Sequence, residues 1–287
     1  MIPQSEIKNN KINCGLYVVS TPIGNMGDIT LRAIEVLKQS QYILCEDTRV
    51  SKKLLEKYNI KSRLISNHKF NEKKNLINVM EIIKSQKIVS IISDAGTPTV
   101  SDPGKIIINE CLKNNYNVYP VPGASAVTAA ISISGFSEKY YFYGFLPEKE
   151  KILNEDFEIL ANLNSSIVFF IPSNKFNKSI NILKNFFSDR KILICREISK
   201  FYEEYLRYNV SDLKLIDKKL KGELTIVLSE KNSKNNTSSY LDESDKKSIK
   251  KLIKILSIKD TVNLMSKNTK ISKKEIYNYC LKLKNEK

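Results

Sequence analysis

Short apolar runs recur along the first 121 residues and alternate with segments whose apolar residues have helical spacing. The apolar runs have the length and β-branched content of buried strands. They are LYVVS (16–20), YILCE (42–46), IVSIIS (88–93) and VYPV (118–121). The helical segments are 29–40, 75–85 and 104–115. Because strands that alternate with helices are typical of an open parallel sheet, this pattern predicts an α/β domain.

A second series of the same kind follows. Its strand-like runs are SIVFFI (166–171), KILICRE (191–197) and LTIVLSE (224–230). Its helical patterns are ILANL (159–163) and FNKSINILKNFF (176–187). The sequence therefore predicts two α/β domains, 1–121 and 122–231, which meet in the VPGAS segment (121–125). The polar, apolar-poor stretch 232–245 is predicted to be a linker.

The last segment, 246–287, is predicted to be a basic helical extension. Ser272 and Glu275 have the spacing of a capping box. The apolar positions expected to pack this segment into a small helical unit are Leu252, Ile255, Leu264, Ile276, Tyr279 and Leu283. Residues 241–287 hold 13 Lys and 6 Asp or Glu, a net charge of +7. This predicts an RNA-docking element, and the alternative is an ordinary solvated helical cap.

The whole chain is strongly basic. Its 47 Lys and Arg against 31 Asp and Glu give a net charge of +16, which fits a polyanionic partner such as nucleic acid. Only six of the basic residues are Arg, so the charge also fits the composition that an AT-rich genome would encode. No apolar run approaches the ~18–20 residues of a membrane helix, and MIPQSEIKNN (1–10) has no apolar stretch. We therefore expect a cytoplasmic protein without a membrane anchor.

Cysteine and histidine usage excludes several chemistries. The five cysteines contain no C-x-x-C pair, which disfavours both a zinc ribbon and a disulfide framework. One histidine, His68, excludes an H-E-x-x-H zinc site, and no metal-ligand cluster is visible. The sequence also lacks G-x-G-x-x-G and the G-x-x-x-x-G-K-[ST] phosphate loop. Dinucleotide and nucleotide-phosphate enzymes are therefore disfavoured.

Glycine and proline gather in loops that follow predicted strands. STPIGNMGD (20–28) follows the first strand, and Asp28-Ile-Thr (28–30) is expected to open the next helix. SDAGTPTVSDPG (93–104) carries Asp94 and Asp102 among small and constrained residues, and VPGASAV (121–127) repeats that character. In open α/β sheets, ligands bind at the carboxyl ends of the strands. These loops are therefore predicted to line a ligand site.

Together, these motifs resemble one family. LYVVSTPIGNMGDITLRA, CEDTR (45–49), SDAGTPTVSDPG and VPGASAV, followed by CREISKFYEE (195–204) and KGELT (221–225), are similar to tetrapyrrole-methylase-like enzymes that use S-adenosylmethionine. Within that family they look like the small-subunit ribosomal RNA methyltransferase I branch. The resemblance implies two α/β domains with the cofactor in the cleft between them, usually in a homodimer. It also implies 2′-O-methylation of a cytidine in the decoding region of 16S ribosomal RNA.

The resemblance implies a set of site residues as well. The residues implied to bind S-adenosylmethionine are Thr21, Pro22, Gly24, Asp94, Ala95, Gly96, Thr97, Ser125, Ala126, Phe170 and Ile171. CEDTR and the His68 segment are implied to face the substrate. Three departures bear on the RNA side: Phe70 and Tyr202 stand where the family commonly has histidine, and IPSNK (171–175) replaces a Glu-Ser-Pro-His-Arg run.

A ribose hydroxyl is a poor nucleophile unless a base removes its proton, a contribution of roughly 10²–10⁴ in rate. The candidate bases are Glu46, Asp47, His68 and Glu197. Glu46 and Asp47 rank first because CEDTR follows a predicted strand, whereas a lone histidine is more often a structural donor. Arg49 is predicted to take a planar, bidentate role beside them.

Three functions remain open at this point. The cofactor loops fit an RNA 2′-O-methyltransferase, and they equally fit a methyltransferase for a small acidic molecule such as a tetrapyrrole precursor. The basic charge and the C-terminal extension favour RNA. A non-catalytic ribosome-binding protein is the third possibility, and the intact cofactor loops argue against it.

Overall fold

The computed structural model describes residues 12–215, 222–231, 241, 243–253, 255–269 and 271–285. Described residues up to Ser229 form one compact unit, and those from Glu230 onward form a second. Three parts of the sequence interpretation lie outside the described residues: the N-terminal segment 1–10, Lys221 of KGELT, and most of the predicted linker, 232–240 with Asp242. No helix among the described residues is long and apolar enough to span a membrane.

The first half of the larger unit is built on a five-stranded sheet of order β3-β2-β4-β1-β5. Its strands are β1 (Gly15–Val19), β2 (Tyr42–Cys45), β3 (Arg63–Ser66), β4 (Ile88–Ile91) and β5 (Val118–Val121). Every pair in this sheet is parallel, as the apolar pattern predicts. All five carboxyl ends therefore lie at one edge, and the loops that leave them are brought together there.

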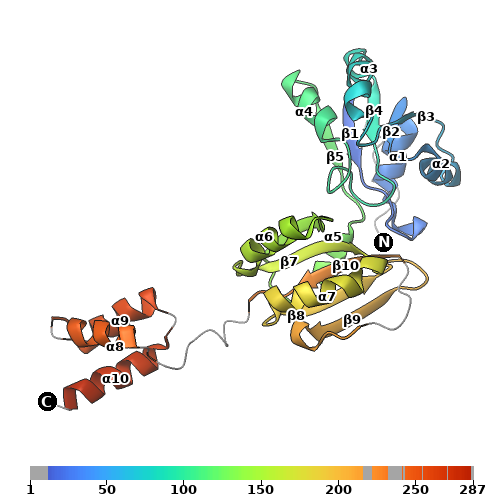
Figure 1. The fold of residues 1–287 in the computed structure, drawn as a ribbon. Helices are drawn as coiled ribbons and strands as arrows, with labels where there is room; N and C mark the ends of the chain where they lie inside the picture. The colour runs from blue at the N-terminus through green and yellow to red at the C-terminus, as the bar shows by residue number, and fades with distance from the viewer. Residues whose placement is uncertain are drawn as a thin grey trace, which may run out of the picture. The chain divides into compact units, whose positions relative to one another are not determined.

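Helices cover both faces of this sheet (Figure 1). The helices are α1 (Leu31–Gln39), α2 (Thr48–Lys57), α3 (Glu72–Lys84) and α4 (Lys105–Lys113). Residues that alternate along β1 take opposite sides: Val19 packs with α1 and α2, and Leu16 packs with α3 and α4. The result is the three-layer α/β arrangement that the sequence predicts.

The second half carries a mixed sheet of order β6-β7-β10-β8-β9. Its strands are β6 (Tyr140–Phe145), β7 (Ser166–Pro172), β8 (Lys191–Arg196), β9 (Glu204–Asn209) and β10 (Glu223–Leu228). β6 runs parallel to β7, and the other pairs are antiparallel. One face packs against α6 (Glu150–Ala161) and α7 (Ser173–Phe187), and the other packs against α5 (Ala126–Ser132).

The structure adds elements that the apolar pattern does not indicate. The strands missed are β3, β6 and β9, and each lies at an edge of its sheet. β3 and β9 are partly solvated along their length and carry charged residues, so they lack a continuous apolar run, whereas β6 reads YYFYGF, an aromatic run that the sequence-based prediction misses. Asp28-Ile-Thr does lead into a helix, as predicted: Thr30 caps α1 by accepting the Ala33 N–H at 3.1 Å, while Asp28 accepts a hydrogen bond from the Ser199 hydroxyl.

The smaller unit consists of α8 (Glu243–Leu252), α9 (Ile258–Asn268) and α10 (Lys273–Asn285) around its own apolar core. Ser272 accepts the Glu275 N–H at 3.2 Å, as the capping-box spacing predicts. The core expectation is wrong at two positions. Ile255 is 82% exposed in the turn between α8 and α9, and Leu264 lies on the outer side of α9.

Candidate functional site

Hydrogen bonds join three of the loops at the carboxyl edge of the first sheet. The loop after β1 pairs with the loop after β4, since the Thr21 N–H donates to the Gly96 carbonyl at 2.8 Å and the Gly96 N–H returns a bond of 3.1 Å. The Thr97 hydroxyl lies 2.9 Å from that of Ser20 and donates to the Ala124 carbonyl at 3.3 Å. Thr97 therefore ties the loop after β4 to the loops after β1 and β5.

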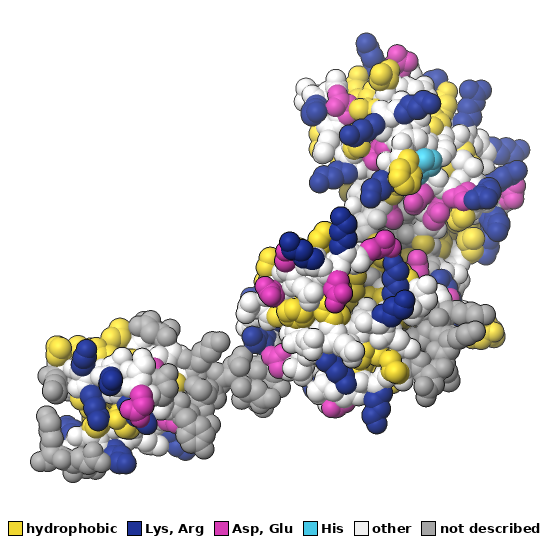
Figure 2. Space-filling view, viewed as in Figure 1, with side chains coloured by type: hydrophobic (Ala, Val, Ile, Leu, Met, Phe, Trp, Pro, Cys, Tyr) yellow, Lys and Arg dark blue, Asp and Glu magenta, His cyan; other side chains and the backbone are white. Residues whose placement is uncertain are grey.

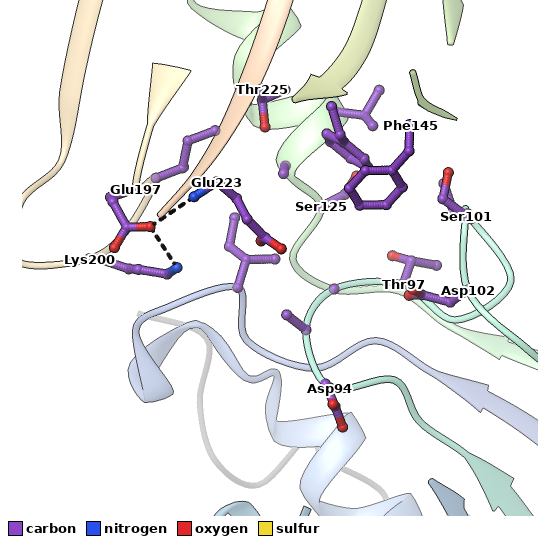
Figure 3. A pocket seen from close by; sticks show the side chains of 18 of the residues that line it. Asp94, Thr97, Ser101, Asp102, Ser125, Phe145, Glu197, Lys200, Glu223 and Thr225 are labelled. Carbon is purple, nitrogen blue, oxygen red and sulfur yellow. Dashed lines mark hydrogen bonds and ion pairs between the residues drawn. The ribbon is translucent and has the colours of Figure 1, made fainter. Parts of the chain in front are cut away.

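A pocket of about 400 Å³ lies between these loops and the second sheet (Figure 3). Predicted site residues that line it are Glu46, Asp94, Ala95, Gly96, Thr97, Ser125, Ala126 and Phe170. An adjoining cavity of about 240 Å³ is lined by Thr21, Pro22 and Gly24. The structure thus brings together residues from loops that are more than 70 positions apart in the sequence.

Four predicted residues line neither cavity. Ile171 is buried in the core under α6 and α7, because it follows Phe170 on β7 and alternate residues of a strand face opposite sides. Asp47 and Arg49, at the start of α2, and His68, in the loop after β3, also lie outside the two cavities.

Carboxylates dominate the charge of the pocket. Glu46, Asp94, Asp102, Glu197 and Glu223 line it, and Lys200 is the one cation among its described lining residues. Burial, together with the charges of Glu46, Asp94 and Glu223 and against a hydrogen bond with Ser93, raises the pKa of Asp102 to about 6. Burial also raises the pKa values of Glu46 and Asp94. A pocket of this kind attracts a positively charged ligand, although carboxylates are individually costly to bury.

The two acidic residues of CEDTR have different environments. Asp47 caps α2, accepts the Arg49 N–H at 2.8 Å and forms an ion pair with the Arg49 guanidinium at 2.7 Å. Hydrogen bonds from Arg49 lower the pKa of Asp47 to about 2. Glu46 instead faces the pocket, and burial is the largest cause of its raised pKa. Glu46 is therefore the stronger base of the two.

His68 lies beside this group without lining the pocket. When it is protonated, His68 lowers the pKa of Glu46 and so opposes the effect of burial, whereas the neutral ring, which can accept a hydrogen bond at Nδ1, does not. Its Nδ1 accepts the Phe70 N–H at 3.3 Å, and the two rings meet edge to face with centroids 6.1 Å apart. The arrangement fits a histidine that shapes its own loop and tunes Glu46.

Asp94 accepts a hydrogen bond from the protein, whereas the Ser125 side chain makes no capping bond. Asp94 already accepts the Asp47 N–H at 3.1 Å, which links the loops after β2 and β4. Ser125 occupies the N-cap position of α5, but its hydroxyl makes no capping hydrogen bond and lines the pocket. A side chain at that position is available to a ligand, and the first turn of α5 directs backbone N–H groups toward the same place.

Several pocket residues are absent from the sequence-based site. Phe145 lies on the edge strand β6, whose aromatic run YYFYGF is the signal that could have placed it. Glu223 and Thr225 alternate along β10 within the KGELT motif, and Lys200 lies within CREISKFYEE. Both motifs carry the family resemblance, and this is the signal that could have placed these three residues at the site.

Comparison with known proteins identifies the family. The model of the tetrapyrrole (corrin/porphyrin) methylases matches residues 15–214. A protein of Rickettsia prowazekii named ribosomal RNA small subunit methyltransferase I is 36% identical over 282 residues, which cover 95% of this chain and 98% of the relative. A protein of the same name from Leptospira biflexa is 40% identical over 228 residues, which cover 78% of this chain and 95% of the relative.

Solved structures agree with this assignment at the level of the fold. Diphthine synthase superposes with a TM-score of 0.59 at 14% identity, over 75% of this chain and 89% of that structure. A cobalt precorrin-4 methyltransferase superposes with a TM-score of 0.56 at 18% identity, over 75% of this chain and 94% of that structure. The chain therefore belongs to the tetrapyrrole methylase family and is a methyltransferase that uses S-adenosylmethionine.

Proposed function

We propose that this enzyme transfers a methyl group to the 2′-oxygen of a cytidine in the decoding region of small-subunit ribosomal RNA. The observation that carries the proposal is the 36% identity to a ribosomal RNA small subunit methyltransferase I over 95% of the chain, a length that includes the C-terminal helices. Methylation of small-subunit ribosomal RNA follows from that similarity. The nucleotide and the oxygen follow from the motif resemblance described above.

The charge of the pocket disfavours the alternative substrate. A small acidic molecule such as a tetrapyrrole precursor would bring several carboxylates to a pocket already lined by five. The carboxylates of the substrate and those of the pocket would repel one another, and this repulsion is stronger in a partly buried pocket than in water. The ribose hydroxyl of a nucleotide brings no charge, and the nucleotide's phosphates can remain outside the pocket.

The residues of the pocket fit S-adenosylmethionine, which supplies an electrophilic methyl group on a positively charged sulfur when it is bound. A volume of about 400 Å³ is in the range of small-molecule sites. Phe145 and Phe170 offer apolar contact area, and their ring centroids lie 5.1 Å apart. In this proposal Asp94 and Ser125 hold polar groups of the cofactor, while backbone at Gly96 and Ala126 approaches it closely.

Glu46 is the base in this proposal. Its pKa is raised by burial, so its carboxylate holds a proton more readily than an exposed glutamate would. Asp47 is a weak base because Arg49 engages its carboxylate. His68 is not the base in this proposal, since its ring accepts a hydrogen bond within its own loop and lines neither cavity.

The function is tested by incubating the enzyme with methyl-labelled S-adenosylmethionine and small ribosomal subunits that lack the modification. We expect label in the small-subunit RNA, and digestion should yield a 2′-O-methylated cytidine from the decoding region. Label on a base, or label only on a tetrapyrrole offered in parallel, would contradict the proposal.

Glu46→Gln should lower the turnover of methyl transfer by roughly 10²–10⁴ and leave the affinity for S-adenosylmethionine almost unchanged. The amide keeps the shape of the side chain and removes its ability to accept a proton. Asp47→Asn is the matched control, and its turnover should fall far less. Single-turnover kinetics and calorimetry measure the two quantities, and equal losses in both variants would argue that CEDTR acts as a unit.

The affinity for S-adenosylmethionine should rise between pH 5 and pH 7. Asp102 has a pKa of about 6, so it is mostly neutral at pH 5 and mostly charged at pH 7. The charged form attracts the cationic sulfur, and a gain of about three- to tenfold is expected. S-Adenosylhomocysteine lacks that charge and should change less. Calorimetry should show a flatter profile for Asp102→Asn, and an unchanged profile would assign the effect to Glu46 or Asp94.

We also propose that the C-terminal unit docks on ribosomal RNA. Lysines of α8 and α10 lie on its exposed positions, and Figure 2 shows basic side chains on the viewed face of this unit. Removing residues 240–287 should weaken binding to small subunits and reduce the log–log salt slope by roughly 0.7–0.9 for each lost phosphate contact. Cofactor affinity should persist, because the pocket lies in the larger unit. If the truncated enzyme binds small ribosomal subunits with the same affinity and the same salt slope, the unit does not dock on RNA and its role is structural.

The homodimer implied by the resemblance remains a proposal. Light scattering on the full-length chain measures its mass directly.

A further inference from the structure

The loop that follows β8, residues 197–203, separates the cofactor pocket from an open groove. The groove is lined by this loop and by the loop after β1, with a volume of about 890 Å³. Among the described residues that line these cavities, Lys200 alone borders the pocket, the adjoining cavity and the groove. It therefore lies where a substrate in the groove would meet the cofactor.

The Lys200 ammonium is held at this junction by a defined partner. Its Nζ lies 3.0 Å from Oε1 of Glu197, and that oxygen also accepts the Glu223 N–H at 3.3 Å (Figure 3). The side chains are 37% and 18% exposed, so the ammonium is still reachable from solvent. A fixed, partly exposed cation beside an acidic pocket is suited to an anionic or oxygen-rich group that enters from outside.

The backbone near the Lys200–Glu197 ion pair adopts unusual conformations. Glu197 and Ser199 have φ values of 51° and 66°, a left-handed conformation that non-glycine residues seldom adopt. A Cβ atom on Gly24 would lie 2.3 Å from Cγ of Lys200, and one on Gly222 would lie 2.0 Å from Oε1 of Glu197. Two glycines therefore leave room for the two side chains. Strain of this kind persists where the surroundings enforce it, and it is concentrated at functional sites.

The next residue faces the groove. Phe201 is 93% exposed, the highest value among the large apolar side chains described, and its ring meets that of Tyr202 edge to face at 5.0 Å. Lys57 lines the same groove. Glu203 also lines it, but its carboxylate is engaged within the loop by the Ser199 N–H and the Tyr205 hydroxyl.

We propose that this loop receives the target nucleotide: Lys200 contacts its ribose and phosphate oxygens, and the ring of Phe201 stacks on an unpaired base. The inference rests on the proposed RNA substrate. Proteins recognise single-stranded RNA by stacking its bases on exposed aromatic rings and by placing cations along its backbone. The groove offers both features beside the cofactor pocket, and the lysines that flank the ring match the charge of a polynucleotide better than that of a second basic chain.

The test measures methyl transfer to small ribosomal subunits by the full-length enzyme carrying Phe201→Leu, Phe201→Trp or Lys200→Gln. Leucine keeps the apolar character of the side chain and removes the aromatic face, whereas tryptophan keeps the face. Ile77→Ala removes another exposed apolar side chain, on α3. Lys113→Gln breaks a second Lys–Glu pair with the same three-residue spacing. These two variants are the matched controls.

We expect Phe201→Leu and Lys200→Gln to raise KM for subunits by about 5- to 100-fold, while Phe201→Trp and both controls stay near the parent enzyme. The affinity of Lys200→Gln for S-adenosylmethionine should be unchanged or tighter, because a cation has been removed from a pocket that binds a cation. A variant that had merely lost its structure would bind both ligands more weakly.

The outcomes separate this inference from the function on which it rests. If the parent enzyme does not methylate small subunits, the proposed function fails. If it does, and Phe201→Leu and Lys200→Gln retain its KM, the nucleotide-receiving role of the loop is wrong. If Phe201→Leu changes the mass seen by light scattering and leaves KM unchanged, the ring contacts a second copy of the chain, which also overturns the inference.

Discussion

The site depends on one constraint, the parallel direction of the strands in the first sheet. Because all five strands end at one edge, loops that are far apart in the sequence leave the sheet side by side. The backbone pairing of Thr21 with Gly96 and the bonds of Thr97 then fix three of those loops to one another. The hydroxyls of Ser20 and Thr97 therefore hold the loops in place. Contacts with a ligand come from other side chains of these loops.

Charge acts at two scales in this molecule. The chain as a whole carries +16, whereas the described pocket lining holds five carboxylates and one lysine. A basic exterior raises the local concentration of a polyanion, and an acidic interior retains a small cation. The two preferences do not conflict in the proposed function, because only the uncharged ribose hydroxyl has to reach the pocket while the phosphates remain outside. Lys200, held by Glu197 at the boundary, is where the two environments meet.

The sequence predicts the central strands and the loops that follow them, because buried parallel strands leave continuous apolar runs and constrained loops concentrate glycine and proline. It misses the edge strands β3 and β9, whose positions are partly solvated, and it does not identify β6 from its aromatic run YYFYGF. Nor does it separate Glu46 from Asp47 or Phe170 from Ile171: neighbouring residues share a motif, and only the backbone direction decides which side chain faces the pocket. Lys200 is missed because its role arises from a left-handed turn and from two distant glycines.

The departures from the family pattern bear on how the proton leaves. Phe70 and Tyr202 stand where histidines are common, and neither ring of theirs can accept a proton at neutral pH as an imidazole can. Each remains an exposed aromatic ring that meets another ring edge to face, His68 in one case and Phe201 in the other. Phe70 and Tyr202 therefore offer aromatic contact area but no general base. In the proposed mechanism, proton transfer therefore rests on a group nearer the pocket, and Glu46 is the candidate whose environment favours it.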